Sequence, residues 1–125
     1  MSTTAKLTIA INRLEQIVSE IEAIAKRTGG NRPAELLACR RDLSEHLGVL
    51  GKLEDTLSEL ANADELKRNY RTHFSAMRNA IAIHQAEWPV FTITDGSEQY
   101  RASVMRTSVT TNAFLTWVKT NILKK

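Results

Sequence analysis

The sequence of 125 residues contains little cysteine, proline or glycine, and each scarcity excludes a class of structure. Its single cysteine, Cys39, cannot form an internal disulfide, so the fold does not depend on an oxidising compartment. Two prolines and five glycines favour long elements over a fold of many tight turns. No uncharged apolar run approaches the ~20 residues that cross a bilayer, and charges at Arg13 and Glu15 interrupt any signal-peptide core. We expect one cytoplasmic, bacterial-type domain over 1–125 that has no membrane partner.

Catalytic, metal-binding and phosphate-binding motifs are also missing from the sequence. The histidines His46, His73 and His84 occur in no HExxH or Glu-x-x-His pattern, and one cysteine cannot form a Cys-x-x-Cys pair. Neither His46 nor His73 precedes the lysine–glycine pair that usually follows a phosphoacceptor histidine. Phosphotransfer or metal binding by a helical bundle is therefore the weakest hypothesis. We expect no catalytic residue, metal ligand or cofactor, and a protein that is not an enzyme.

Apolar residues recur at alternating steps of four and three, which is the spacing of a helix buried along one face. The first series, over about 4–27, places six residues on one stripe: Leu7, Ile11, Leu14, Val18, Ile21 and Ala25. Gly29 and Gly30 end this helix, and Pro33 suits the first turn of the next. Pairing of the stripe with a second copy as a coiled coil is an alternative, although its width suits an intramolecular bundle better.

A second series of apolar residues begins after Pro33 and carries Leu36, Cys39, Leu43, Leu47, Leu50, Leu53, Leu57 and Leu60. Leu57, Leu60, Ala63 and Leu66 then advance by three steps of three, which turns the apolar face by about half a turn on a straight α-helix. We therefore predict a break at 61–63, where Asn62 and Glu65 match a capping box. The alternative is one long helix over 33–88.

Two glycines lie inside this second series, at Gly48 and Gly51. Each costs ~1 kcal/mol relative to alanine in a helix interior. They indicate either a tolerated weakness of the helix or the close approach of a neighbouring helix.

The third series ends at Pro89 and contains Leu66, Tyr70, Phe74, Met77, Ile81, His84 and Trp88. A fourth, over about 97–123, places on one face Val104, Ser108, Thr111, Leu115, Val118 and Ile122. Four helices of similar length with short links predict an all-α, up-and-down antiparallel bundle, with three helices as the alternative. In length and helical layout the chain resembles small bacterial export chaperones of the flagellar type, which implies chaperone-like binding of another protein.

The stretch between the third and fourth series is the only β-prone one, and it contains four large apolar residues: Trp88, Val90, Phe91 and Ile93. Loops carry recognition more often than scaffolds do, and tryptophan and phenylalanine are common interface anchors. Our leading hypothesis is a non-enzymatic protein-interaction module that binds a partner, or a second copy as a homodimer, through a helix seam or this loop. The alternative is that the segment closes the end of the bundle.

Basic residues are unevenly distributed along the sequence. Residues 62–125 contain nine Lys and Arg against five Asp and Glu, whereas residues 1–61 contain eight against nine. A second hypothesis is therefore nucleic-acid binding through Lys67, Arg68, Arg71, Arg78, Arg101 and Arg106. No aromatic platform or helix-turn-helix spacing accompanies these residues, and a solvated helix face has the same pattern.

Overall fold

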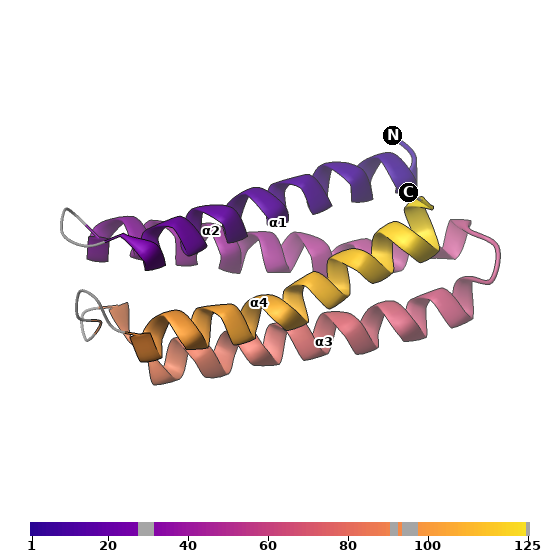
Figure 1. The fold of residues 1–125 in the computed structure, drawn as a ribbon. Coiled ribbons are helices and arrows are strands. Elements are labelled where there is room, and N and C mark those ends of the chain that lie inside the picture. Colours follow the sequence, from indigo (N-terminus) through magenta and orange to yellow (C-terminus); the bar gives the residue numbers. More distant parts are fainter. Residues whose placement is uncertain (28–31, 91–92, 94–97, 125) are drawn as a thin grey trace.

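Four long helices lie side by side in the computed structural model, which describes residues 1–27, 32–90, 93 and 98–124 (Figure 1). They are α1 (Thr3–Lys26), α2 (Arg32–Leu53), α3 (Ala63–Glu87) and α4 (Glu98–Val118). The closest packing is between α1 and α2 and between α3 and α4, and α1 also contacts α4. Each helix runs antiparallel to the next, which confirms the predicted up-and-down bundle (Figure 1).

The connection from α2 to α3 is a short 3₁₀ helix, η1 (Glu54–Glu59), so the second α-helix ends earlier than the spacing suggested. A 3₁₀ helix has three residues per turn, so Leu57 and Leu60, which are three positions apart, lie on one side. Leu57 is fully buried and Leu60 packs against the core. The chain then reverses before Ala63, so the alternative of one helix over 33–88 is wrong.

The predicted capping box at the start of α3 is also wrong. Asn62 precedes the helix, but its backbone is left-handed (φ 58°) and its side chain makes no capping hydrogen bond. A capping side chain reaches the next turn's N–H groups from an extended backbone, which Asn62 does not have. Ser2 has that geometry at α1, where its hydroxyl accepts a hydrogen bond from the Ala5 N–H at 3.1 Å.

At the other end of the bundle, α4 continues as a single π-helical turn, η3 (Lys119–Leu123). The chain therefore stays helical to Leu123, as predicted, although its hydrogen bonds widen in the last turn. This turn directs Ile122 into the core, where it is 7% exposed. Lys124, with a left-handed backbone (φ 54°), ends the helix.

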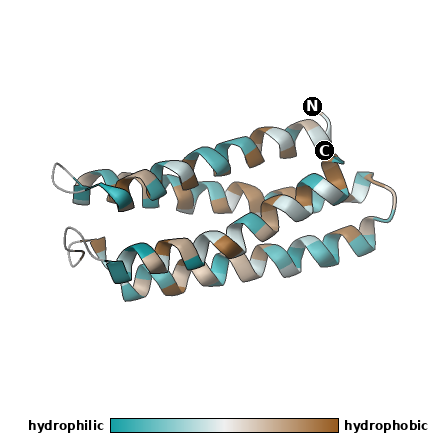
Figure 2. Cartoon of the chain, viewed as in Figure 1, coloured by the Kyte–Doolittle hydropathy of each residue, from teal (hydrophilic) through white to brown (hydrophobic). Residues whose placement is uncertain are grey.

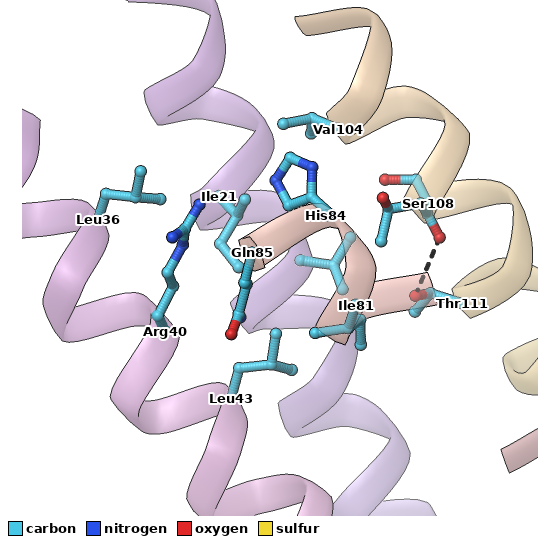
Figure 3. Close-up of a pocket in the computed structure, with 12 residues that line it drawn as sticks. Ile21, Leu36, Arg40, Leu43, Ile81, His84, Gln85, Val104, Ser108 and Thr111 are labelled. Atoms are coloured by element: carbon cyan, nitrogen blue, oxygen red, sulfur yellow. Dashed lines mark hydrogen bonds between the residues drawn. The ribbon is translucent and has the colours of Figure 1, made fainter. Parts of the chain in front are cut away.

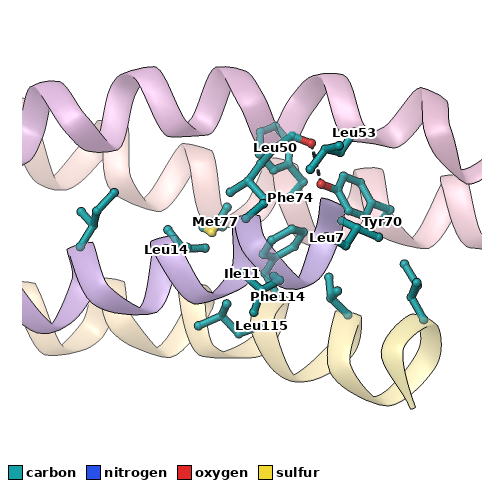
Figure 4. Close-up of a cluster of buried hydrophobic side chains, with 14 of the residues drawn as sticks. Leu7, Ile11, Leu14, Leu50, Leu53, Tyr70, Phe74, Met77, Phe114 and Leu115 are labelled. Carbon is teal, nitrogen blue, oxygen red and sulfur yellow. Dashed lines mark hydrogen bonds between the residues drawn. The ribbon is translucent and has the colours of Figure 1, made fainter. Parts of the chain in front are cut away.

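Hydrophobic and hydrophilic residues are interleaved along every helix, as expected of amphipathic helices (Figure 2). Their buried side chains form two clusters. The larger, here called the central cluster, contains residues of all four helices and of η1, among them Leu7, Leu14, Leu50, Leu57, Tyr70, Phe74, Met77, Phe114 and Leu115 (Figure 4). The smaller, the Tyr100 cluster, consists of Ile24, Ala25, Leu36, Cys39, Val90, Tyr100 and Val104.

The glycines of α2 differ in their surroundings. A Cβ on Gly51 would lie 3.6 Å from the ring of Phe74, which is an ordinary contact, whereas a Cβ on Gly48 would meet nothing within 4 Å. Gly48 is therefore a tolerated weakness of the helix and not a site of close approach. The Gly48→Ala variant is expected to raise the free energy of unfolding, measured by urea denaturation, by about 0.5–1 kcal/mol. The reverse change at exposed Ala38, Ala38→Gly, should lower it by a similar amount, and a destabilised Gly48→Ala protein would contradict this interpretation.

Candidate functional site

A pocket of about 40 Å³ lies where the central cluster meets the Tyr100 cluster, and all four helices contribute to its wall (Figure 3). The lining residues are Val18, Ile21, Leu36, Arg40, Leu43, Ile81, His84, Gln85, Val104, Thr107, Ser108 and Thr111. Half of them are aliphatic, and the others bring a cation, an imidazole, an amide and three hydroxyl groups. An apolar pocket with a few convergent polar groups is the usual form of a small-molecule site.

His84 forms one polar wall of this pocket and is only 8% exposed. Its Nδ1 lies 2.7 Å from the Ser103 hydroxyl, and its ring stacks on Tyr100 with 5.7 Å between the ring centroids. Burial, together with the positive charges of Arg40 and Arg106, lowers the pKa of His84 to about 4. The imidazole is therefore neutral at pH 7 and acts there as a hydrogen-bonding group without charge.

Arg40 brings a positive charge into the same wall. It occupies a position four residues after Leu36 and three before Leu43, and so shares their buried face of α2. Its Nη2 is buried and has no hydrogen-bond partner, and burial lowers the pKa of the guanidinium. Within the described part of the chain, no carboxylate forms an ion pair with it. The pocket thus contains a cation whose hydrogen-bonding capacity is partly unused.

The hydroxyl groups on the far side of the pocket are already engaged. Ser108 donates a hydrogen bond of 2.8 Å to Glu22 Oε1 of α1. Thr111 donates one of 3.4 Å to the Thr107 carbonyl (Figure 3). Ser108 and Thr111 stand at core positions of α4, where their backbone and side-chain partners satisfy them. Arg40 is therefore the pocket residue that has a buried hydrogen-bond donor without a partner.

Cys39 lies next to Arg40 in sequence but belongs to the Tyr100 cluster, where it is 7% exposed. Its Sγ is 3.8 Å from Glu20 Oε2. Burial and the negative charge of Glu20 raise the pKa of the thiol, so it stays protonated. Its burial among apolar side chains agrees with the place of Cys39 in the second apolar series, and a buried cysteine packs as a small hydrophobe. Among the described residues, no group of His, Cys, Asp and Glu side chains is arranged to hold a metal ion.

The structure brings three of the four predicted loop residues together, against the core. Val90 is 8% exposed and belongs to the Tyr100 cluster, and Trp88 and Ile93 pack against it. The ring of Trp88 meets that of Tyr100 edge to face, 5.7 Å between centroids. Phe91 lies outside the described residues. These contacts favour the alternative that the segment closes the end of the bundle, and its role in partner binding stays a prediction.

The basic residues of α3 share one flank of the helix. Lys67 and Arg78 lie within about 40° of Arg71 around the helix axis, on the side that faces η1. Arg71 forms an ion pair there with Glu54, with 2.6 Å between Nη2 and Oε2. Arg68 is exposed and lies about 60° further around the helix. Part of this charge is therefore compensated within the protein.

The basic residues of α4 lie elsewhere. Arg101 and Arg106 are five positions apart, which separates them by about 140° around the helix. Arg106 lines a groove with Ile83 of α3. Arg101 lies on the flank that five turns later carries Lys119, whose Nζ is 2.6 Å from Glu15 of α1. The six predicted nucleic-acid contacts thus lie on three separate surfaces, and the structure does not bring them into one patch.

A further surface, which the sequence patterns did not single out, lies on the outer side of α3 and α4. Large hydrophobic side chains are more than half exposed there: Ile83 (59%), Met105 (52%) and Val109 (68%). Exposed small or uncharged residues lie along the same two helices, namely Thr72, Ala76, Asn79, Ala82, Asn112, Ala113 and Thr116. Between Arg106 and Lys119 the sequence contains no charged residue. We call these ten residues the α3–α4 outer face.

No helix in the described part of the chain is both long and apolar enough to cross a membrane. The chain matches no protein-family model, no curated protein and no solved structure.

Proposed function

We propose that the protein is a non-enzymatic interaction module of the cytoplasm, an adaptor, regulator or small chaperone, that binds a partner polypeptide through the α3–α4 outer face. The supporting observation is the exposure of Ile83, Met105 and Val109 on two adjacent helices. Large apolar side chains that gather on a surface are characteristic of protein-interaction sites, whereas single ones are normal. The lack of charge between Arg106 and Lys119 adds to this, because interface centres are depleted of charged residues.

The shape of this surface fits a helical partner. Two grooves border this surface, one lined by residues that include Ile83, Glu87 and Arg106 and the other by residues that include Val109 and Ala113. An amphipathic helix binds such a groove with apolar residues at one face. A second copy of this chain is one candidate partner, because its own helices are amphipathic.

Affinity capture with the full chain tests the proposal. A Val109→Glu variant buries a charge in the interface and is expected to lower recovery of the bound partner at least tenfold, because an unpaired buried charge costs several kcal/mol. Ile9→Glu is the matched control, because Ile9 is 58% exposed on α1, outside the α3–α4 outer face. Sedimentation velocity of both variants shows whether the partner is a second copy. Equal recovery by Val109→Glu and Ile9→Glu would refute the proposal.

The same experiment separates this surface from the loop. Trp88 and Val90 pack in the Tyr100 cluster, so their substitution would weaken the fold as well as any interface. Phe91→Ala is the more informative variant. Loss of the partner from Phe91→Ala, with full recovery by Val109→Glu, would assign binding to the loop and not to the α3–α4 outer face.

A further inference from the structure

The interior pocket places a positive charge beside aliphatic walls. Arg40 supplies the charge, and its buried Nη2 has no hydrogen-bond partner. On the opposite side, Glu22 is engaged by the Ser108 hydroxyl. A buried N–H group without a hydrogen-bond partner is costly, and an anion that donates nothing and accepts from the guanidinium removes that cost.

The pocket also defines the size and shape of what it can hold. Its volume of about 40 Å³ is enough for roughly three water molecules, each of which needs about 10–15 Å³. The surfaces next to Arg40 are aliphatic, from Val18, Ile21 and Ile81. A phosphate or sulfate would need more donors than one guanidinium, because Ser108 and Thr111 already donate to protein atoms. A planar carboxylate matches the fork of an arginine, and a tail of only one or two carbons matches the volume and the aliphatic walls.

The route into the pocket lies between α2 and α3. These two helices pack less closely against each other than either does against its hairpin partner. Arg40 on α2 and Gln85 on α3 are both half-buried there, and Figure 3 places Gln85 between Arg40 and His84. A ligand that enters this way places its polar end beside Arg40, while its tail reaches the interior.

We propose that this pocket binds a small aliphatic monocarboxylate, with the carboxylate on Arg40 and the hydrocarbon tail against Val18, Ile21 and Ile81. The proposal is independent of the α3–α4 outer face, since the two surfaces share none of these residues. The neutral imidazole of His84 borders the same space and offers its Nε2 as a further donor or acceptor, depending on the tautomer.

Titration of the full chain with acetate, followed by the methyl resonances of Val18, Ile21 and Ile81, tests the proposal. Saturable shifts of these methyl groups are expected, and ethanol, which has the same number of carbons without the charge, should bind at least tenfold more weakly. Arg40→Met should lower acetate affinity at least tenfold and leave ethanol binding within twofold. Arg41→Met is the matched control, because Arg41 is the exposed neighbour of Arg40, and it should leave both affinities within twofold.

Several outcomes would overturn the assignment. Acetate that shifts no pocket methyl in the wild-type chain would show that the pocket does not take a monocarboxylate. Equal affinities for acetate and ethanol would show that Arg40 does not recognise the carboxylate. Unchanged acetate binding by Arg40→Met, in a variant that retains the wild-type circular dichroism spectrum, would lead to the same conclusion.

Discussion

Replacing Phe114 with alanine is expected to lower the free energy of unfolding by about 3–5 kcal/mol. Phe114 is fully buried near the C-terminal end of α4. Its ring meets Tyr70 edge to face at 5.2 Å and Phe74 at 5.9 Å between centroids, so the variant loses two aromatic contacts as well as buried area. A domain of this size is stable by only about 5–15 kcal/mol, so the variant loses a large part of its stability. Urea denaturation followed by circular dichroism measures the change.

Val109→Ala is the matched control for Phe114→Ala. Val109 lies on the same helix and is 68% exposed, so its truncation should change the free energy of unfolding by less than about 0.5 kcal/mol. A Phe114→Ala protein that loses less than about 1 kcal/mol would contradict the packing described for the central cluster. Loss of stability in Val109→Ala comparable to that in Phe114→Ala would do the same.

The fold could be predicted because apolar spacing reports directly which side of each helix is buried. Leu7, Leu14, Tyr70 and Phe114 are all fully buried, and the first three lie on stripes that the sequence shows plainly. The break before α3 was predicted as well, from apolar steps of three. The 3₁₀ helix that forms this break was not predicted. Apolar steps of three also fit the three-residue turn of such a helix, which contains Leu57.

The pocket was harder to predict because it depends on which helices face each other. His84, Ser108 and Thr111 interrupt apolar stripes, and a polar residue at a core position is a signal for a polar interior that sequence alone can give. Arg40 gives no such signal, since an arginine in a helix is usually exposed. Only the packing of α2 and α3 around one space brings Arg40 near His84.

The directions of the basic side chains depend on rotation around the helix axis, which their order along the sequence does not show directly. Arg101 and Arg106 are close in sequence, yet their directions differ by about 140° around the helix. They therefore lie on two different surfaces of the bundle. Arg71 finds an acidic partner, Glu54, on an element that the sequence assigned to a continuous α-helix. Charge counts along a sequence therefore overestimate the size of a patch when neighbouring helices divide it.

The second large effect is a loss of stability in acid that His84 controls. Its pKa is about 4 in the folded protein, because burial and the charges of Arg40 and Arg106 disfavour the imidazolium, whereas an unfolded histidine has a pKa of 6.5. Above pH 6.5 neither state binds this proton, so His84 adds no pH dependence. From pH 6.5 down to about 4 the unfolded state binds the proton and the folded state does not, so stability falls as the pH is lowered. The total loss is about 3 kcal/mol, and it is complete below pH 4.

Comparison with His84→Gln isolates this contribution from that of the carboxylates. Glutamine does not titrate and can still hydrogen-bond to Ser103, so the variant should lose about 3 kcal/mol less than the wild type between pH 6.5 and 4. Urea denaturation at half-unit pH steps measures both curves. His73→Gln is the control, because His73 stacks on Trp117 outside the pocket and its loss leaves His84 in place. Parallel curves for the wild type and His84→Gln would mean that the pKa of His84 is the same in the folded and the unfolded protein, which would contradict the lowered pKa described for the buried imidazole.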